Sequence, residues 1–441
     1  MKKTLLLTSL VASMVVMAGT TGSVEAYNEN EATFVKGEKP TFVAKKTGVK
    51  TEVKVNETGF SFGGEFKAED LKLGEVTNDK FLDHSKVWAK YELPELKGVK
   101  SYVKATAEPK FIGADKGSAE LEGQASYKYD VLTFGLNSKT NFPFVKSATN
   151  NDNYGKEVKS THKLFVESEE KKDVFVKGLK DVKANVEVKH NYAKTVTKAG
   201  DRVDYVSGEA SAKYDGVKDL ELEGKVAFKR NVKSGEKIED YEVLGTKLFT
   251  KKDAKYIHSY ELKGTYKGVE HLTLSAKPFV AHVHINDNKD QILYGTELVT
   301  EYKMLNDKLT LTGKSLLAGN TDKTSFVTKA GEKESTIVTK VYFVFDANAK
   351  YDYSVTDKFT VSPEANANLL LVVSKGINGT ATKPELTLTP KVSAEYKATD
   401  TLTLKGSVEA PVKFEVNTTS KKFEYKQTQL KTSLNLKYEW K

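Results

Sequence analysis

Apolar and polar side chains alternate strictly over long stretches of this chain. In residues 401–416, TLTLKGSVEAPVKFEV, every even position is apolar or small, and every odd position except Pro411 is polar or charged. Residues 292–304, 337–351 and 385–398 show the same alternation. A period of two places successive side chains on opposite faces of a β-strand. The sequence therefore predicts an all-β protein whose strands are apolar on one face and polar on the other.

The predicted strands follow one another in a regular unit. Five segments start at a tyrosine, pass through a short turn and enter a new alternating run, at residues 214–224, 266–276, 302–313, 351–361 and 396–406. The connections at the other strand ends are longer and polar, and the longest covers residues 318–335. Tight turns near residues 97, 131, 180, 216, 268, 306, 355 and 399 predict about eighteen strands, within a range of about 16–20, from 59–68 to 423–440.

So many long strands favour closure of the sheet. An open sheet leaves two edges of unpaired backbone groups, and closure into a cylinder removes them. The alternating runs cover roughly 10–16 residues, whereas strands of soluble proteins average about 5–6 and a tilted strand needs about 9–11 to cross a bilayer. We therefore expect a single antiparallel transmembrane β-barrel with short periplasmic turns and longer extracellular loops.

The overall composition is consistent with this prediction. Mean hydropathy is −0.48, but an average hides strands that face lipid on one side and water on the other. The 69 Lys and Arg against 60 Asp and Glu give a formal charge of +9. This modest excess, spread along the chain, indicates solvated faces and no nucleic-acid partner. Cysteine is absent, which excludes disulfides, thiolate metal sites and a lipid-anchor cysteine.

The N-terminus has the features of a secretory signal peptide over residues 1–26. Lys2 and Lys3 precede the apolar run TLLLTSLVASMVVMAG, and Val24-Glu25-Ala26 has the spacing of a cleavage site. Residues 27–58 alternate only weakly, so we expect an N-terminal extension there, followed by the barrel at residues 59–441.

The last residues, SLNLKYEWK, place Leu434, Leu436, Tyr438 and Trp440 on one face. This end resembles the C-terminal strand of Gram-negative outer-membrane β-barrel proteins of the porin-like class, although Lys441 follows the final aromatic residue. The resemblance implies a location in the bacterial outer membrane, contact with its lipid and lipopolysaccharide, and assembly by the barrel assembly machinery. A homotrimer is compatible with it.

Aromatic residues near the tight turns are candidates for a girdle at the periplasmic membrane boundary. Aromatic rings favour this boundary because one end of the ring is apolar and the other is wet. Cross-strand aromatic packing in a soluble sheet is the alternative interpretation. The candidates are Tyr214, Tyr266, Tyr302, Tyr351, Tyr396, Tyr438 and Trp440.

Charged residues on the polar strand faces are candidates for the lining of a pore. About eighteen strands leave an aqueous channel, so we predict passive diffusion of small polar solutes or ions, with at most a mild anion preference. A plugged or collapsed lumen is the alternative. The predicted pore-lining residues are Lys391, Glu395, Lys397, Lys405, Glu409, Lys413, Glu415 and Lys437.

Signals for chemistry are weak, so we predict no enzyme activity, cofactor or metal site. No Walker or HExxH motif occurs, and His282 and His284 have no evident third metal ligand nearby. Two other functions stay open beside the pore. One is a surface adhesin or receptor that displays its loops on a barrel, and the other is a secreted soluble β-repeat protein.

Overall fold

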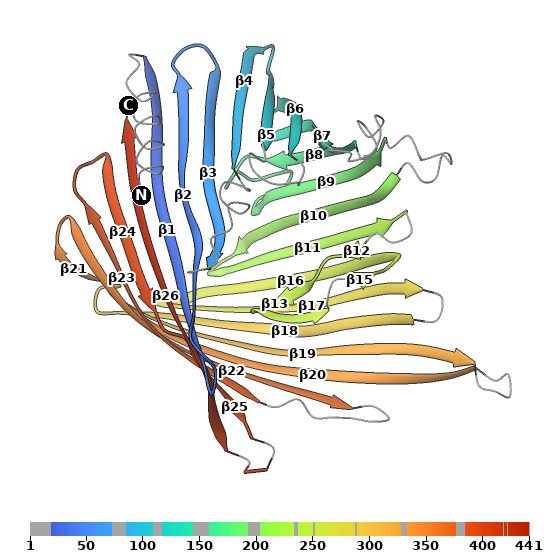
Figure 1. Ribbon diagram of the computed structural model, residues 1–441. Coiled ribbons are helices and arrows are strands. Elements are labelled where there is room, and N and C mark those ends of the chain that lie inside the picture. Colours follow the sequence, from blue (N-terminus) through green and yellow to red (C-terminus); the bar gives the residue numbers. More distant parts are fainter. Residues whose placement is uncertain are drawn as a thin grey trace, which may run out of the picture.

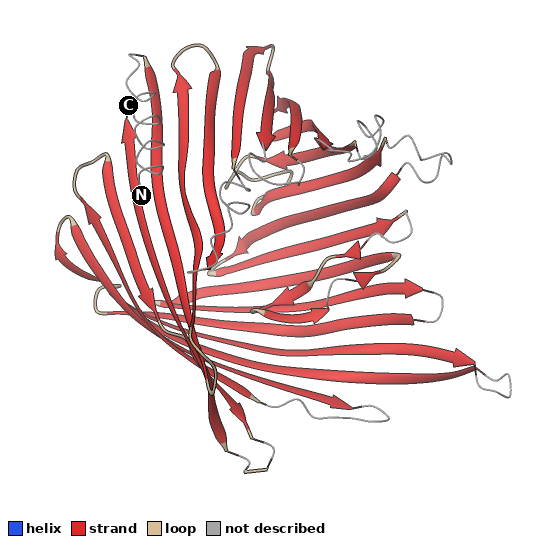
Figure 2. Ribbon diagram, viewed as in Figure 1, coloured by secondary structure: helices blue, strands red, loops and turns tan. Residues whose placement is uncertain are grey.

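The computed structural model describes residues 19–72, 85–108, 117–143, 158–192, 203–232, 237–249, 252–286, 289–327, 333–375, 384–417, 419–420 and 422–440. Every regular element in these ranges is a β-strand (Figure 2). The described residues contain no helix with the length and hydrophobicity needed to cross a membrane.

One large antiparallel sheet forms the body of the molecule (Figure 1). Its 22 strands make a wall of twenty, because β21 continues β20 and β25 continues β24. The strands are β1 (Thr20–Val35), β2 (Thr41–Val55), β3 (Phe60–Lys72), β4 (Lys86–Leu96), β5 (Val99–Glu108), β6 (Ser118–Tyr129), β7 (Leu132–Pro143), β8 (Lys159–Ser168), β9 (Leu179–Asn191), β10 (Val203–Val217), β11 (Leu220–Asn231), β16 (Tyr256–Val269), β17 (Leu272–Asn286), β18 (Lys289–Met304), β19 (Leu309–Val327), β20 (Lys333–Tyr351), β21 (Tyr353–Thr356), β22 (Phe359–Lys375), β23 (Glu385–Lys397), β24 (Leu402–Glu409), β25 (Val412–Val416) and β26 (Phe423–Trp440).

The sheet closes on itself. Each wall strand pairs with the next along the chain, and the first strand pairs with the last, from Gly22 opposite Trp440 to Val35 opposite Gln427. Figure 1 shows β1 between β2 and β26. Closure removes the edge strands of so large a sheet. The predicted closed antiparallel barrel is confirmed, with two strands more than the predicted eighteen.

The two additional strands are β1 and β2, in the segment that the sequence assigned to a leader and an extension. Residues 27–58 lie almost entirely in β1, β2 and the turn after β2, so they belong to the barrel wall. The predicted leader boundary at Ala26 falls inside β1, where Ala26 pairs with Val49 and Leu436. The rest of the predicted leader, residues 1–18, lies outside the described residues.

Short turns join the strands at the end of the barrel that also carries the chain terminus Trp440. Seven of the eight predicted turns lie within three residues of their predicted positions. The one predicted near residue 180 is the longer connection 169–178, and an unpredicted turn, 56–59, joins β2 to β3. Several turns need a left-handed residue, with φ of 79° at Gly98 and 52° at Asp130, and Gly and Asp adopt this conformation at low cost.

Two wall strands are interrupted where prolines interfere with the ladder. Pro363 lies between the last β20–β22 pair, Lys350 with Glu364, and the first β21–β22 pair, Tyr353 with Val361. Pro390 and Pro411 lie at the break between β24 and β25. Proline lacks the N–H that a ladder needs. Its carbonyl still accepts, since Ala410 N donates to Pro390 O at 2.9 Å.

Candidate functional site: the barrel lumen

The two faces of the wall differ in chemistry and in exposure. On β17 and β18, Val280 and Ile292 are 41% and 45% exposed, whereas the alternating positions Ala281 and Leu293 are fully covered. Nearer the turns, the positions on the same face as Ala281 are occupied by Lys277 and other charged residues, whose side chains line a cavity. Side chains on the concave face of a curved sheet converge and cover one another, so the covered, mostly charged set faces the lumen. The exposed apolar set faces outward.

The predicted aromatic residues lie on the outward face near the turn end. Tyr266 on β16 is opposite Leu220 on β11 and Leu274 on β17. Both leucines follow closely after a short turn. Tyr438 and Trp440 stack with ring centroids 6.3 Å apart. Tyr214, Tyr302, Tyr351 and Tyr396 occupy equivalent levels opposite Leu222, Leu272, Leu309 and Leu404. The structure thus brings all seven residues to one level, and their contact with a membrane boundary stays a prediction.

A belt of alternating charge crosses six adjacent strands on the lumen face. The register pairs each residue with its neighbour of opposite sign, in the order Lys350, Glu364, Lys391, Glu409, Lys431 and Glu31. Lys431 Nζ lies 3.0 Å from Glu409 Oε1, and Lys391 Nζ lies 3.8 Å from Glu364 Oε2. These ion pairs keep long side chains extended along the wall, so the belt is polar but nearly neutral.

A row of small hydroxyl residues follows the belt toward the turn end. Ser362, Ser393, Ser407 and Ser433 are in register on four adjacent strands, and the Ser407 and Ser433 hydroxyls are 2.7 Å apart. The next row restores the charge, with Lys405 Nζ 2.9 Å from Glu395 Oε2. Short side chains between two charged rows leave a depression in the wall.

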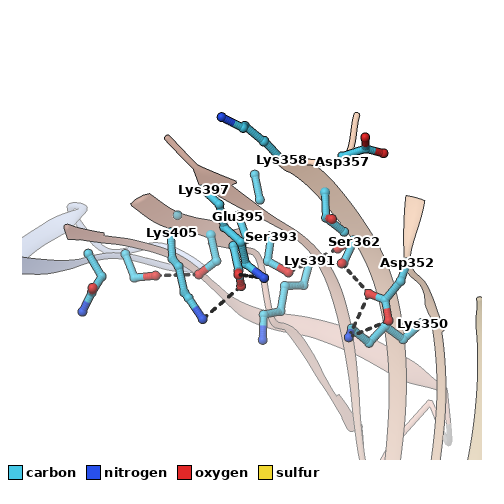
Figure 3. A pocket seen from close by; sticks show the side chains of 16 residues that line it. Lys350, Asp352, Asp357, Lys358, Ser362, Lys391, Ser393, Glu395, Lys397 and Lys405 are labelled. Atoms are coloured by element: carbon cyan, nitrogen blue, oxygen red, sulfur yellow. Dashed lines mark hydrogen bonds and ion pairs between the residues drawn. The ribbon is translucent and has the colours of Figure 1, made fainter. Parts of the chain in front are cut away.

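This depression is a cavity of about 480 Å³, shown in Figure 3. Five lysines and three acidic residues line it, so the local charge is modestly positive. Asp352 accepts from Ser362 and also contacts Lys350 Nζ at 2.9 Å, as the dashed lines of Figure 3 show. The charged residues that line the cavity are Lys350, Asp352, Asp357, Lys358, Lys391, Glu395, Lys397 and Lys405.

The structure divides the predicted pore-lining residues into three groups. Lys391, Glu395, Lys397 and Lys405 surround the cavity together, and Glu409 lies beside Lys391 in the charge belt. Lys413 and Glu415 lie farther toward the loop end on β25, where Lys413 Nζ is 2.6 Å from Glu385 Oε2. Lys437 lies near the turn end of β26 and pairs with Glu439 at 2.6 Å. Whether these residues line a conducting path stays a prediction.

A segment between β11 and β16 packs against the lumen face over its described residues 237–249 and 252–255, which we call the lumen insert. It contains the short strands β12 (Lys237–Ile238), β13 (Tyr241–Val243), β14 (Thr246–Phe249) and β15 (Lys252–Asp253), which Figure 1 shows beside β16 to β18. Leu248 and Phe249 are almost completely buried, in one cluster with Ala281, Leu293 and Leu316 of the wall. The insert thus covers an apolar part of the lumen face.

Hydrogen bonds fix the lumen insert to the wall. Asn320 Nδ2 donates to Leu248 O at 2.6 Å, and the Tyr241 hydroxyl donates to Glu261 Oε1 at 3.2 Å. Burial and the Glu261 carboxylate raise the pKa of Tyr241, so its hydroxyl stays a donor at ordinary pH. A connection that is both packed and hydrogen-bonded behaves as part of the wall.

The sequence prediction missed this insert. It placed the longest loop at residues 318–335, but Leu309–Val327 and Lys333–Tyr351 are strands β19 and β20, which pair up to Val327 and Lys333. One signal was available, because the interval from Tyr214 to Tyr266 is the longest between successive repeat tyrosines. A longer interval leaves room for an additional segment at the loop end.

The two histidines noted in the sequence lie on the outward face. His284 Nδ1 is 2.7 Å from Asp290 Oδ1, and His282 Nε2 is 3.4 Å from the same oxygen. Among the residues that the structure describes, no group of three or more His, Cys, Asp or Glu is arranged to hold a metal ion.

Closure, strand number and the chemistry of the two faces together define a closed antiparallel β-barrel with an apolar outward face, as the sequence predicted. No family model matches the chain, and no curated protein sequence matches it.

Several solved outer-membrane structures show a distant similarity. In-vitro folded OmpT, an outer membrane protein of Vibrio cholerae, is 12% identical, with 96% of this chain and 100% of that chain covered and a TM-score of 0.36. OpdQ of Pseudomonas aeruginosa is 9% identical, with 96% and 99% covered and a TM-score of 0.44. The copper transporter OprC is 9% identical, with 96% and 84% covered and a TM-score of 0.46. Similarity of this degree says nothing about a solute or an activity.

Proposed function

We propose that the protein is a bacterial outer-membrane channel through which small polar solutes or ions diffuse passively. The observation that supports this most directly is the division of the wall into two faces. The outward face is apolar and exposed, while the lumen face carries the charge belt and the serine row. Hydrocarbon outside and water inside satisfy both faces at once.

The height of the outward apolar face fits a bilayer. On β17, eight to ten residues separate Leu274, opposite the girdle residue Tyr266, from His282 and His284, where the outward face becomes polar. At a rise of about 3.3 Å per residue and a tilt of about 40°, this distance corresponds to roughly 20–25 Å along the barrel axis, close to the usual height of the apolar band.

The charges of the lumen support only weak selectivity. A barrel of twenty strands is wide enough for an aqueous channel, and the lumen insert narrows it near the loop end. Most lysines of the lumen face are paired with carboxylates, so little net field acts on a passing ion. The excess of lysine around the cavity beside the serine row favours anions mildly.

The alternatives fit the structure less well. An adhesin would display long loops, but residues 318–335 are mostly strand. A soluble β-repeat protein would leave residues such as Val408 and Leu434, which are 50% and 54% exposed, in contact with water.

We also propose that a leader is removed before β1. Val16 and Ala18 are small residues at the spacing of a cleavage site that precedes Gly19, and cleavage there leaves β1 intact. Mass spectrometry of the mature chain would identify its first residue. Assembly by the barrel assembly machinery and a homotrimeric state also belong to this proposal, on the resemblance of the last strand.

Single-channel recording on the refolded mature chain tests the proposal. We expect stepwise conductance that scales with salt concentration, from samples whose electrophoretic mobility changes on heating, as closed barrels show. A heat-modifiable sample that inserts but gives no conductance would exclude the open pore and favour the adhesin. A folded sample that stays in solution without detergent or lipid would favour the soluble protein.

A further inference from the structure

Imidazole and guanidinium groups gather on one part of the outward face, near the loop end of β8 to β17. His162, His190, His258, His282 and His284 account for five of the seven histidines of the chain. Arg230, the one arginine among the described residues, lies on the same face and is exposed. The lumen function does not use any of these outward side chains.

The strand register arranges these residues, apart from His190, in two rows around the barrel. One row runs from His162 through Val188, Val206 and Arg230 to Tyr256 and His284. The second row lies two residues nearer the turn end and contains Phe228, His258 and His282. We call these two rows, on β8 to β17, the histidine rim.

Polar side chains first appear among the apolar and aromatic residues of the outward face at the rim. The row directly below is apolar or aromatic on every strand, with Val226, Tyr260 and Val280 in register on β11, β16 and β17. In the next outward row on the loop side of the rim, polar residues take the place of apolar ones on four of the strands. The rim is therefore the level at which the outward face leaves hydrocarbon.

Contacts within the rim preorganise its rings. The Tyr256 ring lies 4.8 Å from His284, stacked, and 5.1 Å and 5.7 Å from His258 and His282, edge to face. Asp290 on β18 is the acidic group that faces this cluster, at 2.7 Å from His284 Nδ1. On β8, His162 Nδ1 is 2.9 Å from Ser138 Oγ. The Asp290 carboxylate thus contacts the two imidazoles of β17.

We infer that the histidine rim is a docking surface for the phosphate-bearing headgroups of outer-leaflet lipid. The inference rests on the proposed membrane position, which puts the rim roughly 20–25 Å from the periplasmic girdle, at headgroup level. Arg230 supplies a permanent cation that can bind phosphate through two N–H groups. The exposed imidazoles of His258 and His282 beside it carry ring N–H groups that can donate to the same phosphate oxygens.

Native mass spectrometry of the barrel in phosphatidylcholine nanodiscs with added lipid A tests the inference. The triple variant R230Q/H258Q/H282Q removes the guanidinium and two imidazoles of the rim. The matched control is H271Q, in the turn between β16 and β17, whose side chain is 46% exposed at the opposite end of the barrel. A cation near a lipid surface contributes about fivefold to binding, and the two imidazoles add hydrogen-bond donors, so the triple variant should retain lipid A at least about fivefold less well.

The outcomes separate this inference from the channel proposal. Wild type and H271Q that retain lipid A equally, with weak retention by a triple variant of unchanged conductance, support the rim. Equal retention by all three proteins overturns the rim and leaves the channel intact. Full displacement of lipid A by inorganic phosphate alone overturns a lipid-docking role. Failure of the wild type to insert overturns the membrane position and the inference with it.

Discussion

At the scale of single residues, the charge belt determines what the lumen offers to an ion. Lys391 lies at the centre of the belt, between Glu364 and Glu409. It also lines the cavity beside the serine row. The substitution K391E places three carboxylates side by side and reverses the local charge excess. We expect the ratio of anion to cation permeability to fall about twofold, on the order of 0.4 kcal/mol. The reversal potential in a salt gradient measures this ratio.

A matched charge reversal in a turn isolates the effect of position. Lys218 lies in the turn between β10 and β11, outside the lumen face. K218E changes the net charge by the same amount, so it should leave the reversal potential unchanged. Equal shifts in the two variants would mean that overall charge, and not the belt, sets the selectivity.

At the scale of elements, the lumen insert is the feature that distinguishes this barrel from an unobstructed cylinder. Leu248 is 1% exposed and packs in the cluster that joins the insert to the wall. Truncation of a buried leucine costs about 2–5 kcal/mol, which is enough to release a short segment. We therefore expect L248A to show a larger conductance and rapid tryptic cleavage within the insert, with the barrel still heat-modifiable.

The neighbouring Lys247 provides the control, because its side chain is 55% exposed and pairs only at the surface with Asp240. Surface substitutions usually change stability by less than about 0.5 kcal/mol, so K247A should conduct and resist trypsin like the wild type. Rapid cleavage of L248A without a rise in conductance would show that the insert packs in the lumen but does not limit the flow.

The elements that the sequence predicted well are those with local signals. Turns that need a left-handed residue use Gly98 and Asp130, and a long apolar alternation marks β23, β24 and β26. β1 lacked that signal because Asn28 and Asn30 occupy its outward face, where Asn28 Nδ2 donates to Thr47 Oγ1 at 2.7 Å. A polar outward position satisfied by a neighbouring strand is not visible in the pattern of one strand.

For the site residues, too, the pattern along one strand predicts only what depends on local alternation. Lys391, Glu395 and Lys405 were placed on one face by alternation alone, and the structure brings them together. The insert could not be located in this way, because Leu248 and Phe249 are buried against β17 to β19, which lie farther along the chain. Contacts that depend on closure of the barrel have no counterpart in local periodicity.

At the scale of the whole molecule, closure depends on an even number of strands. β1 runs away from the turn end, while its neighbours β2 and β26 both run toward it. Deletion of residues 20–35 would leave β2 and β26 parallel, whereas deletion of residues 20–55 would bring β3 beside β26 in an antiparallel arrangement. Antiparallel pairs need only the hydrogen-bond pattern that the rest of the wall already uses.

We therefore expect opposite results from the two deletions. The shorter deletion should abolish the heat-modifiable species, because the barrel cannot close without a change in pairing. The longer deletion should give a closed barrel of eighteen strands, about a tenth narrower since diameter grows roughly linearly with strand number, with a smaller conductance. If the chain without residues 20–35 folded and conducted like the full-length protein, β1 would not belong to the wall, and residues 27–58 would be the extension that their weak alternation indicated.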